Sequence, residues 1–200
     1  PAPPPRPDPA ERYRSPYSTG EKVKRLLWAL VERTLFRLSF PTWYNYRAAL
    51  LRCFGASVGP RSMIRRSVRF ECPWNFSCGE RCAIGNDAVI YALGPITLGH
   101  RVSISQFSHL CAGTHDFSDP LLSLVRPAII LKDDAWLGAD AFVGPGVTLE
   151  TGALLGARAS AFSDLAAWTI NVGNPARPVK ARPRIDLIAV RDETGPPLGA

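Results

Sequence analysis

The 200-residue sequence lacks the features that mark several whole classes of protein. No uncharged apolar run reaches about 18 residues, so a membrane-spanning helix is not expected, and the glycines follow no triplet period, so the chain is not collagen-like. Charged residues are few, at 20%, while hydrophobic residues make up 46%. A chain of this composition can bury a core, and its length fits one compact domain with a small appendage.

Cysteine and histidine are also scarce. The five cysteines are an odd number without a Cys-x-x-Cys pair, and no secretory signal is recognised before them, which favours reduced thiols in a cytoplasmic protein. There are only three histidines, namely His100, His109 and His115.

Acidic residues are outnumbered by basic ones. The 24 lysines and arginines against 17 aspartates and glutamates give a net charge of +7 and a pI near 9.5. Such a balance favours anionic partners, which include phosphates, acidic glycans, nucleic acids and membrane surfaces. Nucleic-acid binding is not expected, because the arginines are spread over the whole chain and no known binding module occurs.

Proline and glycine, by contrast, are abundant, at 19 and 16 residues. Seven of the prolines fall within the first sixteen residues, with arginine and aspartate between them, so residues 1–20 are predicted to be a disordered Pro-rich tail. The next segment, residues 21–55, is predicted to be a helical prefix.

The prefix is predicted to contain two helices. Apolar residues recur at helical spacing from Thr19 onward, lysines and arginines occupy the remaining positions, and Pro41 ends this amphipathic helix. A shorter helix spans about Trp43 to Cys53 and is closed by Gly55. Contact between residues 21–38 and an anionic inner membrane is one interpretation, and a cap on the main domain or between subunits is the other.

Beyond the prefix, an apolar or small residue recurs every six positions. The spacing is two residues instead of six at two places, after Phe70 and after Ile96, and we call these places register slips. The positions are Val58, Ile64, Phe70, Cys72, Cys78, Ile84, Ile90, Ile96, Leu98, Ile104, Leu110, Leu131, Leu137, Val143, Leu149, Leu155 and Ala161. The following residue is often glycine, and four positions later small or apolar residues predominate, from Ser62 to Thr114 and on to Ala159.

A period of six fits neither a helix nor a simple strand. A short strand followed by a corner, three times per coil, gives a triangular β-solenoid in which the apolar position points inward. Glycine is favoured near the corner by backbone crowding or by a positive φ. The sequence therefore predicts an all-β solenoid over residues 56–182, with four to five coils of about 18 residues, followed by a C-terminal tail over 183–200.

The hexads and four longer stretches resemble one family. The stretches PWNFSCGERCAIG, SHLCAGTHDFSDP, AWLGADAFVGPGVTL and VGNPARPVK are similar to the hexapeptide-repeat, left-handed β-helix acetyltransferases of the colanic-acid-biosynthesis type, relatives of the galactoside and maltose O-acetyltransferases. The similarity spans about Leu26 to Arg182. It implies a left-handed parallel β-helix, an exception to the right-handed crossover rule, a homotrimer with active sites between subunits, and acetyl-CoA as the donor.

The resemblance also implies a catalytic group. His115 lies where the repeat breaks off and would deprotonate the acceptor hydroxyl, a task suited to imidazole because the unperturbed pKa of that group is about 6.5. Asn75 would lie near the base and the acceptor and could stabilise the oxyanion. Asp116 could orient the imidazole.

Five residues are implied for acetyl-CoA. Trp136 and Ala139 would flank the pantetheine, Ala157 would bond through its backbone, and Arg177 and Lys180 would meet the nucleotide phosphates.

The predicted function is acetyl-CoA-dependent O-acetylation of a saccharide hydroxyl, with a polysaccharide or lipid-linked sugar precursor as acceptor and no metal. N-acetylation of an amino-sugar nucleotide is the alternative. Two remoter alternatives are a γ-class carbonic-anhydrase-like metal enzyme, which would need all three histidines as ligands, and a non-catalytic scaffold.

Overall fold

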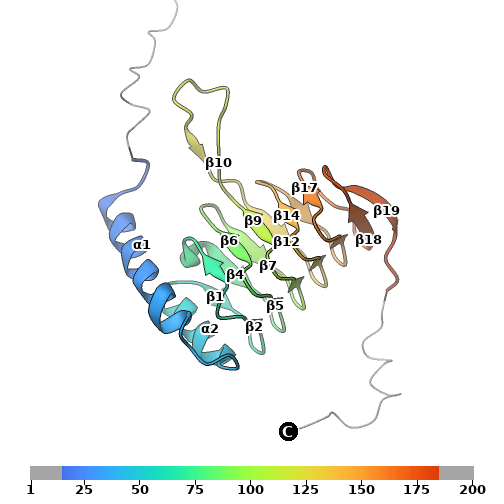
Figure 1. Ribbon diagram of the computed structural model, residues 1–200. Helices are drawn as coiled ribbons and strands as arrows, with labels where there is room; N and C mark the ends of the chain where they lie inside the picture. Colours follow the sequence, from blue (N-terminus) through green and yellow to red (C-terminus); the bar gives the residue numbers. More distant parts are fainter. Residues whose placement is uncertain (1–14, 185–200) are drawn as a thin grey trace, which may run out of the picture.

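The computed structural model describes residues 15–184, which form a left-handed parallel β-helix with helices at its N-terminal end (Figure 1). Most of the two predicted tails lies outside the described residues. Each coil adds one strand to each of three faces, and successive coils pair in parallel.

The three faces are named A, B and C in the order in which the chain visits them. Face A consists of β1 (Ser57–Val58), β4 (Phe76–Cys78), β7 (Ile96–Leu98), β12 (Ile129–Leu131) and β15 (Thr148–Leu149). Face B consists of β2 (Met63–Ile64), β5 (Ala83–Ile84), β8 (Ser103–Ile104), β13 (Trp136–Leu137), β16 (Leu154–Leu155), β18 (Thr169–Val172) and the antiparallel edge strand β19 (Arg177–Ala181). Face C consists of β3 (Arg69–Phe70), β6 (Val89–Tyr91), β9 (His109–Cys111), β14 (Phe142–Val143) and β17 (Ser160–Ala161).

The hexad positions form the core. All 17 predicted inward positions are at most 6% exposed, which confirms the register. Most residues four positions later are buried as well, but Thr114 is exposed because the chain has already left the solenoid there. The prediction of four to five coils was slightly low, since a sixth turn follows in which Leu165 bridges Leu149 and β18 pairs with β16.

Both register slips occur at the corner between faces C and A. Val58 pairs with Cys78, and Cys78 with Leu98, so the first two coils hold 20 residues each. From Leu131 to Leu149 the coil has the expected 18. The extra residues of the early coils lie between face C and face A, where the third coil carries its long insertion between β9 and β12.

Backbone crowding explains the hexad glycines. A Cβ on Gly79 would lie 2.7 Å from the carbonyl oxygen of Gly99 in the next coil. None of the seven hexad glycines has a positive φ. In the described chain eleven non-glycine residues have one, and several of them, such as Arg61, Arg81 and Asp87, lie two residues after a hexad glycine. Of the two causes predicted for these glycines, close approach of the coils is the one that applies.

The prefix covers the open end of the first coil. It comprises α1 (Thr19–Val31), the π-helical turn η2 (Glu32–Phe36) and α2 (Tyr44–Cys53), and the short 3₁₀ turn η3 (Pro73–Asn75) lies nearby. The Trp28 indole donates a 2.7 Å hydrogen bond to the Phe70 carbonyl, and the Phe36 ring packs edge-on against Phe70. The side of the prefix that faces the solenoid therefore acts as a cap on the main domain, as one of the two interpretations predicted.

Two details of the prefix differ from the prediction. The helix begins at Thr19, where the helical spacing begins in the sequence, and is capped by the Ser18 side chain, so the segment predicted to be a tail, residues 1–20, overlaps it by two residues. The first helix also does not continue regularly to Pro41 but widens into a π turn at Glu32. A wider turn keeps Glu32 and Phe36, four residues apart, on the side that faces the solenoid.

Candidate active site

His115 lies on a hairpin outside the solenoid. The strands β10 (Thr114–His115) and β11 (Leu124–Val125) pair antiparallel, with His115 opposite Leu124. The hairpin projects from the corner between faces C and A (Figure 1). His115 is exposed there.

One backbone contact determines the tautomer of His115. Its Nδ1 lies 2.5 Å from the carbonyl oxygen of Leu122, and because a carbonyl can only accept, Nδ1 carries the hydrogen. In the neutral imidazole, Nε2 is then unprotonated and can accept a proton. Leu122 has a positive φ of 48°, which belongs to the tight turn that brings its carbonyl to the imidazole.

Asp116 does not orient the imidazole, contrary to the prediction. Its carboxylate accepts hydrogen bonds from the backbone N–H and the hydroxyl of Ser118, at 2.9 and 2.5 Å, and these bonds lower its pKa. The side chain thus stabilises the turn that follows β10, while the Leu122 carbonyl holds His115.

Asn75 lies at the same corner, two coils before the hairpin. Its amide nitrogen donates to the carbonyls of Ala92 and Leu93, both at 2.9 Å. The backbone N–H of Gly94 then donates to Ala112 at the start of the insertion. In this structure the Asn75 amide nitrogen is bonded to two backbone carbonyls, and its predicted role beside the base and the acceptor stays a prediction.

The five predicted acetyl-CoA residues lie on face B or its edge. Trp136 on β13 is 43% exposed, and its indole donates to Ser105 at 3.2 Å. Ala139 and Ala157 occupy the corner between faces B and C. Arg177 and Lys180 are exposed on β19. Within one chain these residues are separated from His115, because the corner between faces C and A lies opposite face B in a triangular prism.

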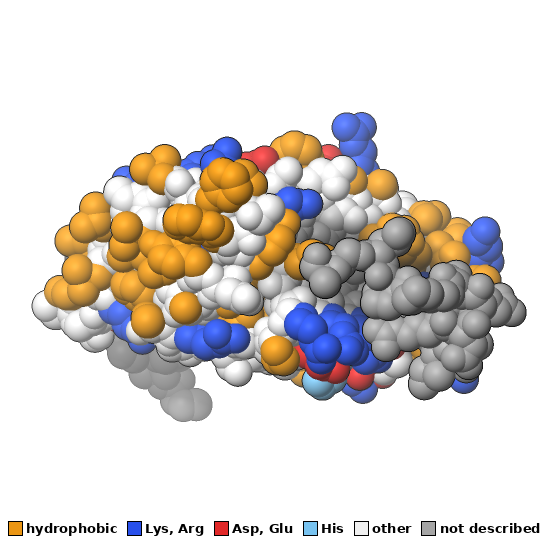
Figure 2. Space-filling model, turned by 90° about the horizontal axis from the view of Figure 1, so that it is seen from below, with side chains coloured by type: hydrophobic (Ala, Val, Ile, Leu, Met, Phe, Trp, Pro, Cys, Tyr) orange, Lys and Arg blue, Asp and Glu red, His pale blue; other side chains and the backbone are white. Residues whose placement is uncertain are grey.

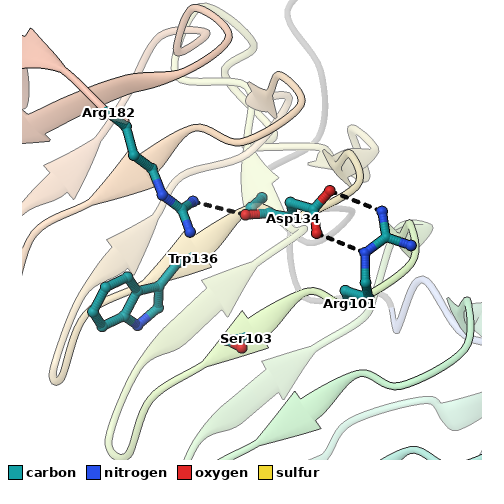
Figure 3. A pocket seen from close by; sticks show the side chains of 6 residues that line it. Arg101, Ser103, Asp134, Trp136 and Arg182 are labelled. Carbon is teal, nitrogen blue, oxygen red and sulfur yellow. Dashed lines mark hydrogen bonds and ion pairs between the residues drawn. The ribbon is translucent and has the colours of Figure 1, made fainter. Parts of the chain in front are cut away.

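A pocket of about 450 Å³ opens on face B beside Trp136 (Figure 3). Its lining consists of Arg101, Ser103, Asp134, Ala135, Trp136 and Arg182. The Asp134 carboxylate accepts two hydrogen bonds from Arg101, at 2.7 and 2.8 Å, while Arg182 donates to the Asp134 carbonyl at 2.8 Å. The Arg182 guanidinium also lies 5.9 Å from the Trp136 ring centroid.

Sequence reasoning missed the arginines of this pocket and a contact behind the hairpin. Arg126 follows β11, and its guanidinium lies 5.4 Å from the Tyr17 ring centroid and 3.7 Å from the Glu21 carboxylate. These contacts join the start of α1 to the base of the hairpin. The sequence indicated only that arginine is in excess. It could not predict the contacts of Arg126, because its partners lie about a hundred residues earlier in the sequence.

The other two histidines have different surroundings. His109 packs between Tyr91 and Phe142, and burial lowers its pKa. His100 accepts a 3.3 Å hydrogen bond from the Glu80 backbone. Within residues 15–184, no group of three or more His, Cys, Asp or Glu side chains is placed to hold a metal ion.

Sequence comparison identifies the family. No family model matches the chain. The chain is 40% identical over 163 residues to a protein of Escherichia coli (strain K12) provisionally named colanic acid biosynthesis acetyltransferase WcaF. The aligned region covers 82% of this chain and 90% of that protein. The chain belongs to the WcaF family of acetyltransferases.

Solved structures agree with the WcaF-family fold. A maltose O-acetyltransferase from Clostridium difficile 630 superposes with a TM-score of 0.74 at 21% identity, covering 84% of this chain and 90% of that one. A hexapeptide-repeat acetyltransferase from Vibrio cholerae O1 biovar eltor, complexed with acetyl coenzyme A, gives 0.74 at 20% identity, covering 86% and 94%. These likenesses confirm the predicted hexapeptide-repeat β-helix.

Proposed function

We propose that residues 56–182 of this WcaF-family protein catalyse acetyl-CoA-dependent O-acetylation of a saccharide hydroxyl, in a polysaccharide or lipid-linked sugar precursor. The observation that carries the proposal is the fixed tautomer of His115, whose Nε2 is left unprotonated on an exposed hairpin. A group with this geometry can take a proton from a sugar hydroxyl.

The proposed reaction is a direct transfer. His115 Nε2 takes the hydroxyl proton as the acceptor oxygen attacks the acetyl carbonyl. The carbon–sulfur bond then breaks, and the proton on the imidazolium passes to the leaving thiolate. The products are the O-acetylated saccharide and free CoA, and the side chain returns to its starting state without an acyl-enzyme.

Face B supports the donor side of the proposal. Trp136 offers an apolar surface for pantetheine, and Arg177 and Lys180 on β19 offer exposed cations for the nucleotide phosphates. Arg182, beside Trp136, adds a third cation to this face. The residues present thus fit acetyl-CoA.

The proposal includes a homotrimer. His115 projects at the corner opposite face B, so one chain does not bring the base to its own donor face. A neighbouring chain packed beside face B would supply the missing His115.

The proposed location is the cytoplasm, at the inner membrane. A lipid-linked acceptor would be presented at that surface, and the prefix segment 21–38 is the proposed peripheral contact. Within residues 15–184 no helix is long and apolar enough to cross a membrane.

An acceptor screen tests the function. The purified protein is incubated with acetyl-CoA and with neutral sugars, saccharide-lipid precursors and amino-sugar nucleotides, and thiol release is followed with mass spectrometry of the product. Acetyl esters on saccharide hydroxyls are expected. Acetylation of amines alone would replace the proposal with the N-acetyltransferase alternative.

A further inference from the structure

The outer side of the prefix carries an exposed apolar surface. Its nine side chains come from α1, η2, the following loop and α2, and we call them the docking face: Val23, Leu26, Leu27, Leu30, Leu35, Leu38, Phe40, Trp43 and Tyr46. Their exposure ranges from 37% for Tyr46 to 77% for Leu38. Figure 2 shows hydrophobic side chains gathered over the end of the molecule that these helices form.

The cap on the solenoid does not require this surface. The inner side of the prefix already buries Trp28 and Phe36 in the core, with Leu51 of α2. Leu26, Leu27 and Leu30 lie on the opposite side of the same helix. Large contiguous apolar patches are uncommon on monomeric proteins and mark contacts with another body.

The charges around the docking face have one sign. Lys22, Arg33 and Arg37 are exposed and form no ion pair within residues 15–184. The two acidic residues of the prefix face inward instead. Glu21 pairs with Arg126, and Glu32 accepts a 2.6 Å hydrogen bond from the Phe70 backbone.

We infer that the docking face binds the surface of an anionic lipid bilayer. Leucines would enter the acyl region, and Lys22, Arg33 and Arg37 would meet lipid phosphates. Trp43 packs against Phe40 and Tyr46, with ring centroids 6.2 and 5.7 Å apart, and such aromatic residues favour the headgroup level. The surface extends beyond the predicted segment 21–38, because the loop and α2 contribute its aromatic part.

The charge pattern favours lipid over a second copy of this chain. In a two-fold contact the same patch meets itself, so the two sets of Lys22, Arg33 and Arg37 would be brought together without a carboxylate of the docking face between them. Anionic headgroups neutralise the same three cations. The inference deepens the proposed location of the enzyme, but it does not depend on the proposed chemistry.

Vesicle co-sedimentation of the full chain tests the inference. The vesicles contain phosphatidylcholine alone or an equal mixture with phosphatidylglycerol. Binding to the mixed vesicles is expected, and the double variant Leu26→Ser/Leu30→Ser weakens it by about tenfold or more. The matched control is Met63→Ser, which removes a half-exposed apolar side chain from face B and leaves binding unchanged.

A second pair tests the charges. Arg33→Gln/Arg37→Gln should reduce the preference for mixed vesicles several-fold, whereas Arg61→Gln on the solenoid should not. Equal vesicle binding by the leucine variant and the wild type overturns the inference, as does absence of binding by the wild type. A smaller sedimenting species for the leucine variant, without vesicle binding by any form, assigns the face to a second copy instead.

Acetyl transfer to a soluble sugar is measured on the same samples. The leucine variant should keep this activity, because its substitutions lie outside the proposed active site. Vesicle binding without any transferase activity would contradict the proposed function but would still support lipid binding by the docking face.

Discussion

The imidazole of His115 is oriented by a backbone oxygen rather than by a carboxylate. Leu122 fixes the tautomer through a neutral hydrogen bond, and Asp116 is occupied with Ser118. The sequence motif contains His115, but it does not predict which backbone carbonyl contacts Nδ1 in the folded loop. This explains why the position of His115 on the interrupting loop could be predicted from the sequence, while the Leu122 contact of its imidazole could not; its role as a base stays a proposal.

Replacing His115 tests its role as a base. His115→Ala should reduce kcat for acetyl transfer by about 10² or more, because the variant lacks the imidazole proposed to take the hydroxyl proton. Circular dichroism and sedimentation should be unchanged, since the side chain is exposed. Unaltered kcat in the variant would disprove the assignment.

Gly79 illustrates a structural constraint at the same scale. A Cβ there would press on the Gly99 backbone, which belongs to the next coil and cannot move alone. We expect Gly79→Ala to lower the free energy of unfolding by about 1–3 kcal/mol. Gly20→Ala is the control, because a Cβ at that position would meet nothing within 4 Å, and thermal unfolding compares the two. Equal melting temperatures would contradict the crowding explanation.

At the scale of elements, the hexads predicted the strands because inward positions must be apolar in every coil. The long-range details were not predictable in this way. Some residues with positive φ, such as Arg61 and Arg81, carry no local turn signal, and the π turn at Glu32 depends on where the solenoid lies. The two slips were visible, but only stacking of the coils shows that both belong to the corner that carries His115.

The hairpin is anchored to the prefix through Arg126. An ion pair of this exposure, 34% and 23% for the two side chains, is worth about 0.2–1 kcal/mol. Arg126→Ala should therefore lower kcat/KM by up to about fivefold, through looser positioning of the hairpin. Separate measurement of kcat and acceptor KM checks this, and Arg126→Lys should restore part of the loss.

Arg61→Ala supplies the matched control for Arg126. It removes another surface pair, with Glu80 at 3.0 Å, on the solenoid away from the hairpin. Its steady-state constants should stay at the wild-type values. An equal loss in both variants would mean that Arg126 has no specific effect on the hairpin.

For the whole molecule, the separation of His115 from face B leads to a complementation test. Chains with His115→Ala are mixed with chains carrying Arg177→Glu/Lys180→Glu, after partial unfolding and reassembly. If every site combines the base of one chain with the donor face of another, random mixing restores about a quarter of wild-type activity. Activity that stays at the level of the separate variants would show that each chain works alone.

The corner between faces C and A tolerates segments of very different length. The first two coils carry two extra residues there, the third carries a hairpin, and the strands on either side keep their pairing. Because each coil holds its register through its neighbours, a change in this segment does not propagate along the stack. If the proposed function holds, the segment inserted at this corner could be exchanged between relatives to change acceptor preference, while the stacked coils keep their shape.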